Sequence, residues 1–170
     1  MPPQIGAKVQ RAKIEHLRVG DGGRLRLIRL RALANAPDAF GTTLEEATAH
    51  SLEFWECQLE QLATFVATVG GCDVGLARGA PHENIGDTGY LLSMWVAPEV
   101  RRQGIASILV DAVVNWARSR GLNHLLLDVA EKNAPAVALY TRKGFAPTGA
   151  VGTLPPPRAH VREIQMAIRL

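Results

Sequence analysis

Apolar residues near the start of the chain change from a strand-like to a helix-like spacing. Polar and apolar side chains alternate over residues 13–18, which is the period of a short β-strand. A helical spacing follows, with four residues on one helix face: Leu25, Ile28, Leu30 and Leu33. Asp21 is a candidate cap for this helix. We expect the helix to end near Asn35, because Pro37 disfavours helical geometry in the residue before it.

The next fifty residues predict a second helix and a hairpin. Thr43 and Glu46 fit a capping box, so a helix should begin there and run to about residue 62. Two apolar runs typical of strands follow, over residues 64–69 and 73–78. The Gly-Gly pair at residues 70 and 71 favours a tight hairpin between them, and we expect a loop from residue 78 to residue 87.

The second half of the chain alternates strands with helices. It predicts a strand over 90–96, a helix over 104–120, a strand over 124–129, a helix over 133–143 and, after a proline-rich loop, a last strand over 161–168. The run YLLSMWV at residues 90–96 is apolar almost throughout, which is typical of a strand buried on both faces. We therefore expect one α+β domain over residues 10–170, preceded by a flexible extension over residues 1–9.

The composition is that of an ordinary globular protein and excludes several classes. Of the 170 residues, 47% are hydrophobic and 21% are charged, which argues against a disordered or fibrous chain. No apolar stretch suits a transmembrane helix and no secretory signal begins the chain, so we expect a cytoplasmic protein with no membrane partner. The net charge of +3 is too small and dispersed to indicate nucleic-acid binding. The histidines and the isolated Cys57 and Cys72 lack metal-ligand spacing, so no metal is expected.

The turn between the apolar strand and the following helix carries the first chemical signal. Residues 101–106 read Arg-Arg-Gln-Gly-Ile-Ala. The start of a helix leaves backbone N–H groups free, and the positive end of the helix dipole favours anions. Gly104 lets backbone approach a ligand closely, while Arg101 and Arg102 add positive charge. By themselves these residues fit both an anion site and an ordinary helix start packed on a sheet.

A second signal lies one strand later. Asn133 and Tyr140 are seven residues apart, which places them on one face of the next helix. Asn133 also suits a plain helix cap, and Tyr140 also suits a packing aromatic. The two signals gain weight when they are read together.

Together these motifs resemble the GNAT family of N-acetyltransferases over about residues 91–145. The resemblance rests on the Arg-x-x-Gly-x-Ala run that ends at Ala106, on Asn133, and on the pairs Leu139-Tyr140 and Gly144-Phe145. Ala106 stands where many relatives have glycine, and both residues are small. The resemblance implies a GNAT-like acyl-CoA N-acyltransferase fold, in which a central, mostly antiparallel twisted sheet is splayed between strands 4 and 5 and flanked by helices. It also implies acetyl-CoA as co-substrate and no metal.

The same resemblance implies where acetyl-CoA binds, in the opening between the strands over residues 89–96 and 124–129. The residues implied to contact it are Met94, Trp95, Val96, Arg101, Arg102, Gln103, Gly104, Ile105, Ala106, Ser107, Asn133 and Tyr140. The backbone of residues 94–96 would hold the pantetheine arm and polarise the thioester carbonyl. Residues 102–107 would wrap the pyrophosphate, and Tyr140 would lie beside the thioester sulfur.

Transfer of an acetyl group to an amine needs an acid for the leaving thiolate and a base for the amine. Tyr140 is the candidate acid, because a tyrosine has an ordinary pKa of about 10. Asp128, near the end of its strand, is the candidate base, although a surface carboxylate fits that position too. Phe40, Glu45 and Glu46 are candidates for acceptor binding, since acids attract a cationic amine, and ordinary helix surface or core packing also accounts for them.

The expected activity is transfer of acetyl from acetyl-CoA to a primary amine of a small molecule or a protein, by direct attack in a ternary complex. The alternative is a non-catalytic acyl-CoA-binding sensor. Relatives often pair, so a homodimer stays open. Arg158 and His160, in the loop before the last strand, suit either an anionic substrate group or solvent.

Overall fold

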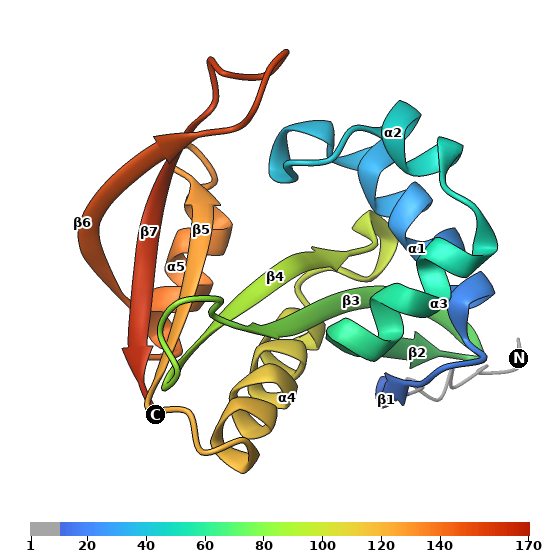
Figure 1. Ribbon diagram of the computed structural model, residues 1–170, viewed down its shortest axis with the longest axis horizontal. Helices are drawn as coiled ribbons and strands as arrows, with labels where there is room; N and C mark the ends of the chain where they lie inside the picture. Colours follow the sequence, from blue (N-terminus) through green and yellow to red (C-terminus); the bar gives the residue numbers. More distant parts are fainter. Residues whose placement is uncertain (1–10) are drawn as a thin grey trace, which may run out of the picture.

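A seven-stranded sheet forms the centre of the computed structural model, which describes residues 11–170 (Figure 1). Its strands are β1 (Lys13–Leu17), β2 (Ala63–Val69), β3 (Cys72–Pro81), β4 (Thr88–Val96), β5 (His124–Ala130), β6 (Ala146–Thr153) and β7 (Arg162–Arg169). The strand order is β1-β2-β3-β4-β5-β7-β6, and every neighbouring pair is antiparallel except β4 and β5. This confirms the expected mostly antiparallel sheet. The expected extension over residues 1–9 lies outside the described residues.

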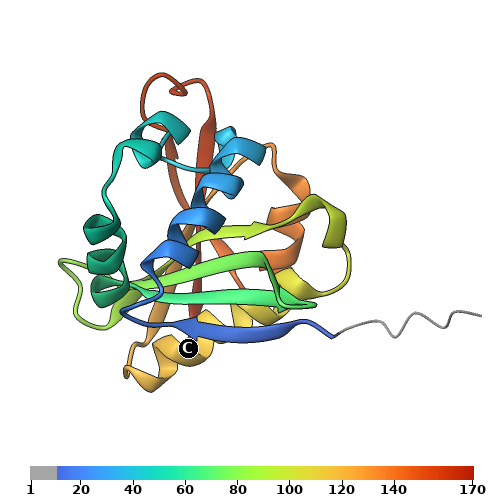
Figure 2. The same cartoon turned by 90° about the vertical axis from the view of Figure 1, so that its right-hand side faces the viewer.

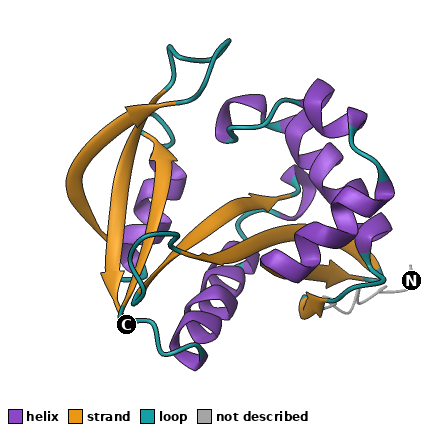
Figure 3. Cartoon of the chain, in the orientation of Figure 1, coloured by secondary structure: helices purple, strands orange, loops and turns teal. Residues whose placement is uncertain are grey.

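Helices cover both faces of the sheet (Figures 1 and 2). They are α1 (Gly22–Asn35), α2 (Leu44–Ala49), α3 (Leu52–Gln61), α4 (Ile105–Ser119) and α5 (Ala134–Arg142), with short 3-10 turns η1 (Pro37–Ala39) and η2 (Pro98–Val100). Arg78 of β3 donates to Gln58 of α3, whereas a Cβ on the next residue, Gly79, would lie 2.5 Å from the ring of Trp116 in α4. Because neighbouring residues of a strand face opposite sides, α3 and α4 cover opposite faces. Figure 3 shows the same layering by element type.

The helix predicted from Thr43 to residue 62 is wrong in one respect, because it is two helices. The capping box is confirmed: the Thr43 hydroxyl accepts from the Glu46 amide, and the Glu46 carboxylate accepts from the Thr43 amide. The chain then leaves helical geometry at His50, and the hydroxyl of Ser51 accepts from the amide of Phe54 to begin α3. A serine cap inside an apolar helical pattern is therefore the signal for the break.

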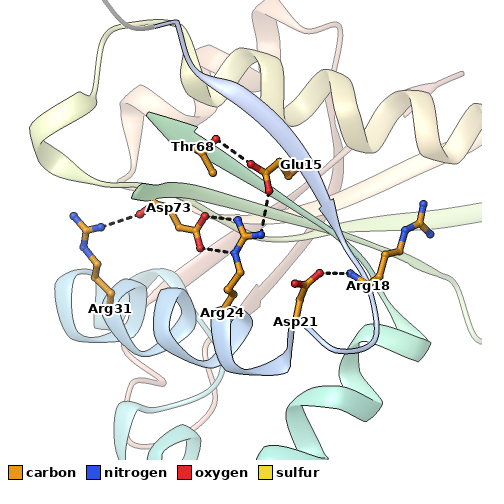
Figure 4. Close-up of polar contacts among 7 residues, drawn as sticks. All are labelled: Glu15, Arg18, Asp21, Arg24, Arg31, Thr68 and Asp73. Carbon is orange, nitrogen blue, oxygen red and sulfur yellow. Dashed lines mark hydrogen bonds and ion pairs between the residues drawn. The ribbon is translucent and has the colours of Figure 1, made fainter. Parts of the chain in front are cut away.

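Helix α1 has the predicted length, but Asp21 does not cap it. The Asp21 carboxylate accepts from the amide of Arg18 at 2.9 Å instead (Figure 4). In the first turn of the helix, Arg24 donates two hydrogen bonds of 2.7 and 3.1 Å to Asp73 at the start of β3 and another to Glu15 of β1. These ion pairs hold the first turn of α1 against β1 and β3.

The loop expected between Phe145 and residue 161 contains a strand that the pattern did not predict. β6 pairs with β7 and is exposed along its whole length, with an irregular register between Pro147 and Val151. It is rich in Ala, Pro and Gly and has no buried face, so it carries no alternating apolar signal. The loop expected over residues 78–87 is also shorter, because β3 continues to Pro81. Among the described residues, no helix is long and apolar enough to cross a membrane.

Candidate functional site

The two parallel strands at the centre of the sheet part after a short contact. β4 and β5 pair at only three positions, the last being Tyr90 with Leu126. Beyond that point β4 keeps only β3 as a neighbour and β5 keeps only β7, and Figure 1 shows the strands diverging. An unpaired strand edge presents free N–H and C=O groups, so both borders of this opening can hydrogen-bond an extended ligand. The splayed sheet expected between strands 4 and 5 is confirmed.

A β-bulge lies in the part of β4 that borders the opening. Leu76 of β3 pairs with Trp95, whereas Arg78 pairs with Leu92, so β4 holds one extra residue between these pairs. Ser93 takes up the bulge with φ of 56°, which is unusual for a residue other than glycine. A bulge re-aims neighbouring backbone groups, and here it acts next to Met94. The sequence gives no sign of it, since serine commonly marks neither a bulge nor a positive φ.

The start of α4 has the features of an anion site. Gly104 is the residue before the helix and has φ of 80°, and a Cβ added there would meet no atom within 4 Å. No side chain caps the helix, and Arg102 is exposed with φ of 64°. The amides of the first turn have no acceptor within the helix, so they are free to bind an anion. Ile105 is buried, so only its backbone is available there.

Arg101 differs from its neighbour because its guanidinium is already engaged. It donates to the carbonyl of Val96 at 2.9 Å and to the side-chain oxygen of Asn35 at 3.1 Å. The same Asn35 oxygen accepts from the indole of Trp95 at 3.0 Å. These bonds fix the end of β4 to the end of α1. Asn35 was not among the predicted residues, and its role depends on contacts 60 or more residues away in sequence.

Helix α5 brings the second predicted motif to the sheet. The side-chain oxygen of Asn133 accepts from the amide of Ala136 at 3.3 Å, so this residue caps the helix. Tyr140 is only 5% exposed and meets Phe145 edge-on at 5.8 Å between ring centroids. Burial raises the pKa of Tyr140 well above its ordinary value. Within residues 11–170 its hydroxyl has no hydrogen-bond partner, so a buried, protonated donor is available.

Asp128 lies on the side of β5 away from the core and lines a hollow of about 240 Å³. Glu163 and Gln165 of β7 line the same hollow, together with residues 150–153 of β6. Burial raises the pKa of Asp128, and the facing Gln165 opposes that rise. Burial and then the charge of Asp128 raise the pKa of Glu163. The result is a partly desolvated pair of carboxylates, of which sequence reasoning found only Asp128.

The predicted acceptor residues differ in exposure and in their partners. Glu45 and Glu46 are exposed in the first turn of α2, and hydrogen bonds from Thr43 lower the pKa of Glu46. Phe40 is buried beneath the guanidinium of Arg29, 5.0 Å from it. The carboxylate of Glu46 is therefore already engaged in the capping box with Thr43, whereas no such bond holds Glu45 within residues 11–170.

A buried arginine in the loop between β6 and β7 connects that loop to the loop that follows α1. Arg158, between β6 and β7, is 8% exposed and donates to the carbonyls of Pro37, Phe40 and Gly41, the last at 2.8 Å. The neighbouring turn η1 also contacts β5. The solvent alternative for Arg158 is therefore wrong, because the side chain is buried and backbone carbonyls hold its Nη1 and Nη2, whereas its Nε has no hydrogen-bond partner within residues 11–170. No three His, Cys, Asp or Glu side chains within residues 11–170 gather where they could hold a metal ion.

Comparison with known proteins places these features in one family. Residues 30–145 match the model of the acetyltransferase (GNAT) family. The chain is 32% identical over 122 residues to a mycothiol acetyltransferase of Thermobispora bispora, a match that covers 69% of this chain and 40% of that protein. The crystal structure of a GNAT-family acetyltransferase from Streptococcus pneumoniae superposes with a TM-score of 0.79 at 19% identity, covering 94% of this chain and 99% of that one.

A further solved structure contains a ligand. An acetyltransferase of Salmonella typhimurium, solved with its cofactor acetyl-CoA, superposes with a TM-score of 0.74 at 19% identity, and the match covers 94% of each chain. At 19% sequence identity, these structural matches show a shared fold and nothing further. The chain spans 22 to 40% of the length of the first curated relatives that it matches.

Proposed function

Because the chain belongs to the GNAT family of acetyltransferases, we propose that it transfers the acetyl group of acetyl-CoA to a primary amine. The amine would attack the thioester directly while both substrates are bound. The observation that carries this proposal is the juxtaposition of the open edge of β4 with the uncapped start of α4. The acetyl-CoA in the Salmonella relative supports the choice of co-substrate.

The turn before α4 suits the pyrophosphate of coenzyme A. The left-handed Gly104 leaves room beside the backbone, the first-turn amides are free, and the exposed Arg102 adds a positive charge. Arg101 adds its charge at a fixed place, because Val96 and Asn35 hold its guanidinium. Gln103, Ala106 and Ser107 complete the segment, and Asn133 would approach the arm from the start of α5.

The open edge of β4 suits the pantetheine arm, which is extended and carries amide groups. Acetyl-CoA, when bound, supplies the acetyl thioester. Backbone N–H groups of residues 94–96, re-aimed by the bulge at Ser93, would donate to the carbonyl oxygen as negative charge develops on it. Such donors act strongly where water is excluded, and Trp95 and Val96 are buried.

The proton balance assigns Tyr140 and Asp128 opposite roles. The amine nitrogen forms a bond to the thioester carbon, and the bond from that carbon to sulfur breaks. Asp128 would take the proton that the amine loses, and Tyr140 would give its proton to the sulfur. The raised pKa of Tyr140 keeps the hydroxyl protonated at neutral pH, which an acid needs.

The hollow beside Asp128 suits the incoming amine. Glu163 and Asp128 together make it electronegative, so it would attract an ammonium group, which releases one proton to solvent before the neutral amine attacks. Partial desolvation of Asp128 raises its basicity, which brings its pKa closer to the working pH of a general base.

Two measurements on the purified chain test the proposal. Calorimetry with acetyl-CoA should give a saturable Kd, and release of free thiol should then depend on an added amine drawn from amino acids, polyamines and peptides. Mass spectrometry should find the acetylated product. No binding and no thiol release would contradict the proposal, and tight binding with no transfer to any amine would instead identify the acyl-CoA sensor.

A further inference from the structure

One side-chain oxygen of α1 accepts hydrogen bonds from two parts of the candidate cofactor site. The Oδ1 of Asn35, the last residue of α1, accepts from the indole Nε1 of Trp95 at 3.0 Å and from Nη2 of Arg101 at 3.1 Å. Trp95 lies near the end of β4, and Arg101 lies in the turn before α4. An amide oxygen has two lone pairs, so these two donors use its full accepting capacity. Asn35 therefore joins the end of α1 to both segments.

The indole of Trp95 is held on a second side by the same helix. The guanidinium of Arg31 lies over the ring, with its Cζ 5.3 Å from the ring centroid, which is the geometry of a cation–π contact. Arg31 in turn donates to the backbone carbonyl of Asp73 at 3.0 Å and forms an ion pair with Glu99. The ring of Trp95 is buried. It is thus enclosed by fixed partners, which restrict rotation of the backbone that carries it.

The backbone groups of Val96 face the opening of the sheet. Ala97 donates its amide to the carbonyl of Val74 in β3 at 2.8 Å, so that amide points away from the opening. Successive residues of a strand direct their N–H and C=O groups to opposite edges, so both groups of Val96 point toward the opening. The Nε of Arg101 donates to the Val96 carbonyl at 2.9 Å. The Val96 N–H is the group that remains to donate to a ligand in the opening.

Backbone pairing restrains this strand end only partly. Beyond its last pair with β5, the edge of β4 that faces the opening has no strand partner, and a β-bulge interrupts its pairing with β3. Strand pairing therefore holds residues 94–96 from one side only. The peptide group that carries the Val96 N–H lies between two points that Asn35 fixes. One is the indole of Trp95, and the other is the Val96 carbonyl, which Asn35 reaches through Arg101.

We propose that Asn35 is a positioning residue for acetyl transfer, because its side-chain oxygen keeps the Val96 N–H directed at the thioester carbonyl. An oxyanion donor is effective when it is already aimed at the place where negative charge develops. Asn35 is itself exposed, so its hydrogen bonds contribute modestly to folding stability, and their main consequence is the direction of this backbone. The inference rests on the proposed transferase function for the reaction, whereas polarisation of the thioester can be measured in the complex with acetyl-CoA alone.

Two substitutions of Asn35 form a matched pair. Asn35→Leu removes the acceptor at nearly constant volume, and Asn35→Asp keeps an oxygen in the same place. A carboxylate accepts from the same indole and guanidinium groups, so the aspartate should rescue what the leucine loses. Asn115→Leu, a change at an exposed position of α4, is the control for the loss of a surface asparagine. The unfolding midpoint of each variant should stay close to that of the wild-type chain.

The first readout is the infrared band of the acetyl C=O group in bound acetyl-CoA, identified by carbon-13 labelling. A hydrogen bond that polarises a carbonyl weakens its C=O bond and lowers its stretching frequency. The band should move to lower frequency when acetyl-CoA binds the wild-type chain. Asn35→Leu should lose about half or more of that shift, whereas Asn35→Asp and Asn115→Leu should retain it.

The second readout separates kcat from binding. Asn35→Leu should lower kcat about 10-fold, which is less than the loss on deleting an oxyanion donor, because the N–H is misdirected and not removed. The Kd of acetyl-CoA should change far less, since Arg101 keeps its charge and its bond to Val96. Asn35→Asp should restore most of kcat.

Several outcomes would overturn the inference while leaving the transferase proposal in place. They are a full frequency shift in Asn35→Leu, no shift in a wild-type chain that binds acetyl-CoA, or equal losses of kcat in Asn35→Leu and Asn35→Asp. A wild-type chain that does not bind acetyl-CoA would overturn both proposals. A frequency shift that depends on Asn35, found together with no transfer to any amine, would refute the transferase alone, so the two failures can be told apart.

Discussion

Tyr140 holds its hydroxyl in surroundings that oppose ionisation. It is buried against Phe145, and burial raises its pKa. Asp128 is placed in the opposite way, at the rim of a hollow where partial burial raises its basicity without removing it from solvent. Two residues on neighbouring elements thus acquire complementary proton-transfer properties from their surroundings.

We expect Tyr140→Phe to lower kcat about 100-fold, which is the usual scale of general acid catalysis. The ring and its packing on Phe145 are kept, and within residues 11–170 the hydroxyl has no partner to lose. Acetyl-CoA affinity by calorimetry and the unfolding midpoint should therefore stay close to wild type. An unchanged kcat would mean that water or another group protonates the thiolate.

The raised pKa of Asp128 makes a prediction about pH. As pH falls through that pKa the carboxylate becomes protonated and cannot accept the proton of the amine. The acidic limb of kcat/KM should lie above the ordinary aspartate value of about 4. Asp128→Asn should lower the rate about 100-fold and remove this limb.

The pH dependence of folding stability provides a control for Asp128, because a raised pKa in the folded chain determines whether stability rises or falls with pH. The folded chain binds the proton more tightly than the unfolded chain, so the contribution of Asp128 to the free energy of unfolding is greatest at low pH. It is lost as pH rises from the unfolded pKa through the folded one. Urea titrations should find a smaller loss over this range in Asp128→Asn. A limb that persists in that variant would assign the base to another group.

At the scale of elements, the turn before α4 leaves the start of a helix uncapped and open, which makes it a candidate binding site for an anion. Gly104 adopts a left-handed conformation, so any other residue there is strained, and the space beside it is empty of protein atoms. The neighbouring strand end is held in place by Arg101 and Asn35. The uncapped start of α4 thus follows closely after the end of β4, which Arg101 and Asn35 hold in place.

Gly104→Asp and Gly104→Asn form a matched pair that tests this corner. Both side chains tolerate a left-handed backbone better than most, and they differ only in charge. Both variants should lose about 1 kcal/mol of unfolding free energy, because a residue other than glycine is strained there. The Asp variant alone should also repel the pyrophosphate, raising the Kd of acetyl-CoA at least 10-fold over the Asn variant by calorimetry. The gap should narrow at high salt. Equal Kd values would remove the pyrophosphate from this turn.

At the scale of the whole molecule, Arg158 helps to join the two halves of the splayed sheet. β4 and β5 share three residue pairs, and the halves also approach each other where η1 contacts β5 and where Arg158 donates to carbonyls of the loop over residues 37–41. The first half carries the open edge of β4, and the second carries Asp128 and Glu163. Arg158 therefore helps to set the spacing between them.

Arg158→Met should weaken this connection by about 2 kcal/mol of unfolding free energy, since three carbonyls lose a charged donor at a buried site. The KM of the acceptor should rise with little change in the KM of acetyl-CoA, because the loops border the acceptor side. Arg162→Met, which removes an exposed pair with Glu131 at 3.7 Å, is the control and should change stability by less than about 1 kcal/mol. Equal effects of the two variants would contradict a bridging role for Arg158.

Most elements of the fold could be predicted from local pattern. The hairpin of β2 and β3 follows from the Gly-Gly turn, and helices α1, α4 and α5 follow from their apolar period, with the Asn133 cap as a further signal for α5, because these signals act between residues close in sequence. β6 could not be found, since an exposed edge strand buries no alternating face. The break between α2 and α3 carried a signal at Ser51 that the longer apolar pattern obscured.

The candidate site divides in the same way. The sequence by itself determined the family, through motifs that lie close together along the chain. It also marked residues 101–107, Asn133 and Tyr140 as candidates, because a helix start and one helix face are local features. Tertiary structure alone decided the bulge at Ser93, the proximity of Asp128 to Glu163 and which arginines have hydrogen-bond partners. Arg24, Arg101 and Arg158 are bound and Arg29 is not, and this depends on groups from distant elements. Desolvation and pairing are set by neighbours in space, and a one-dimensional pattern contains no record of them.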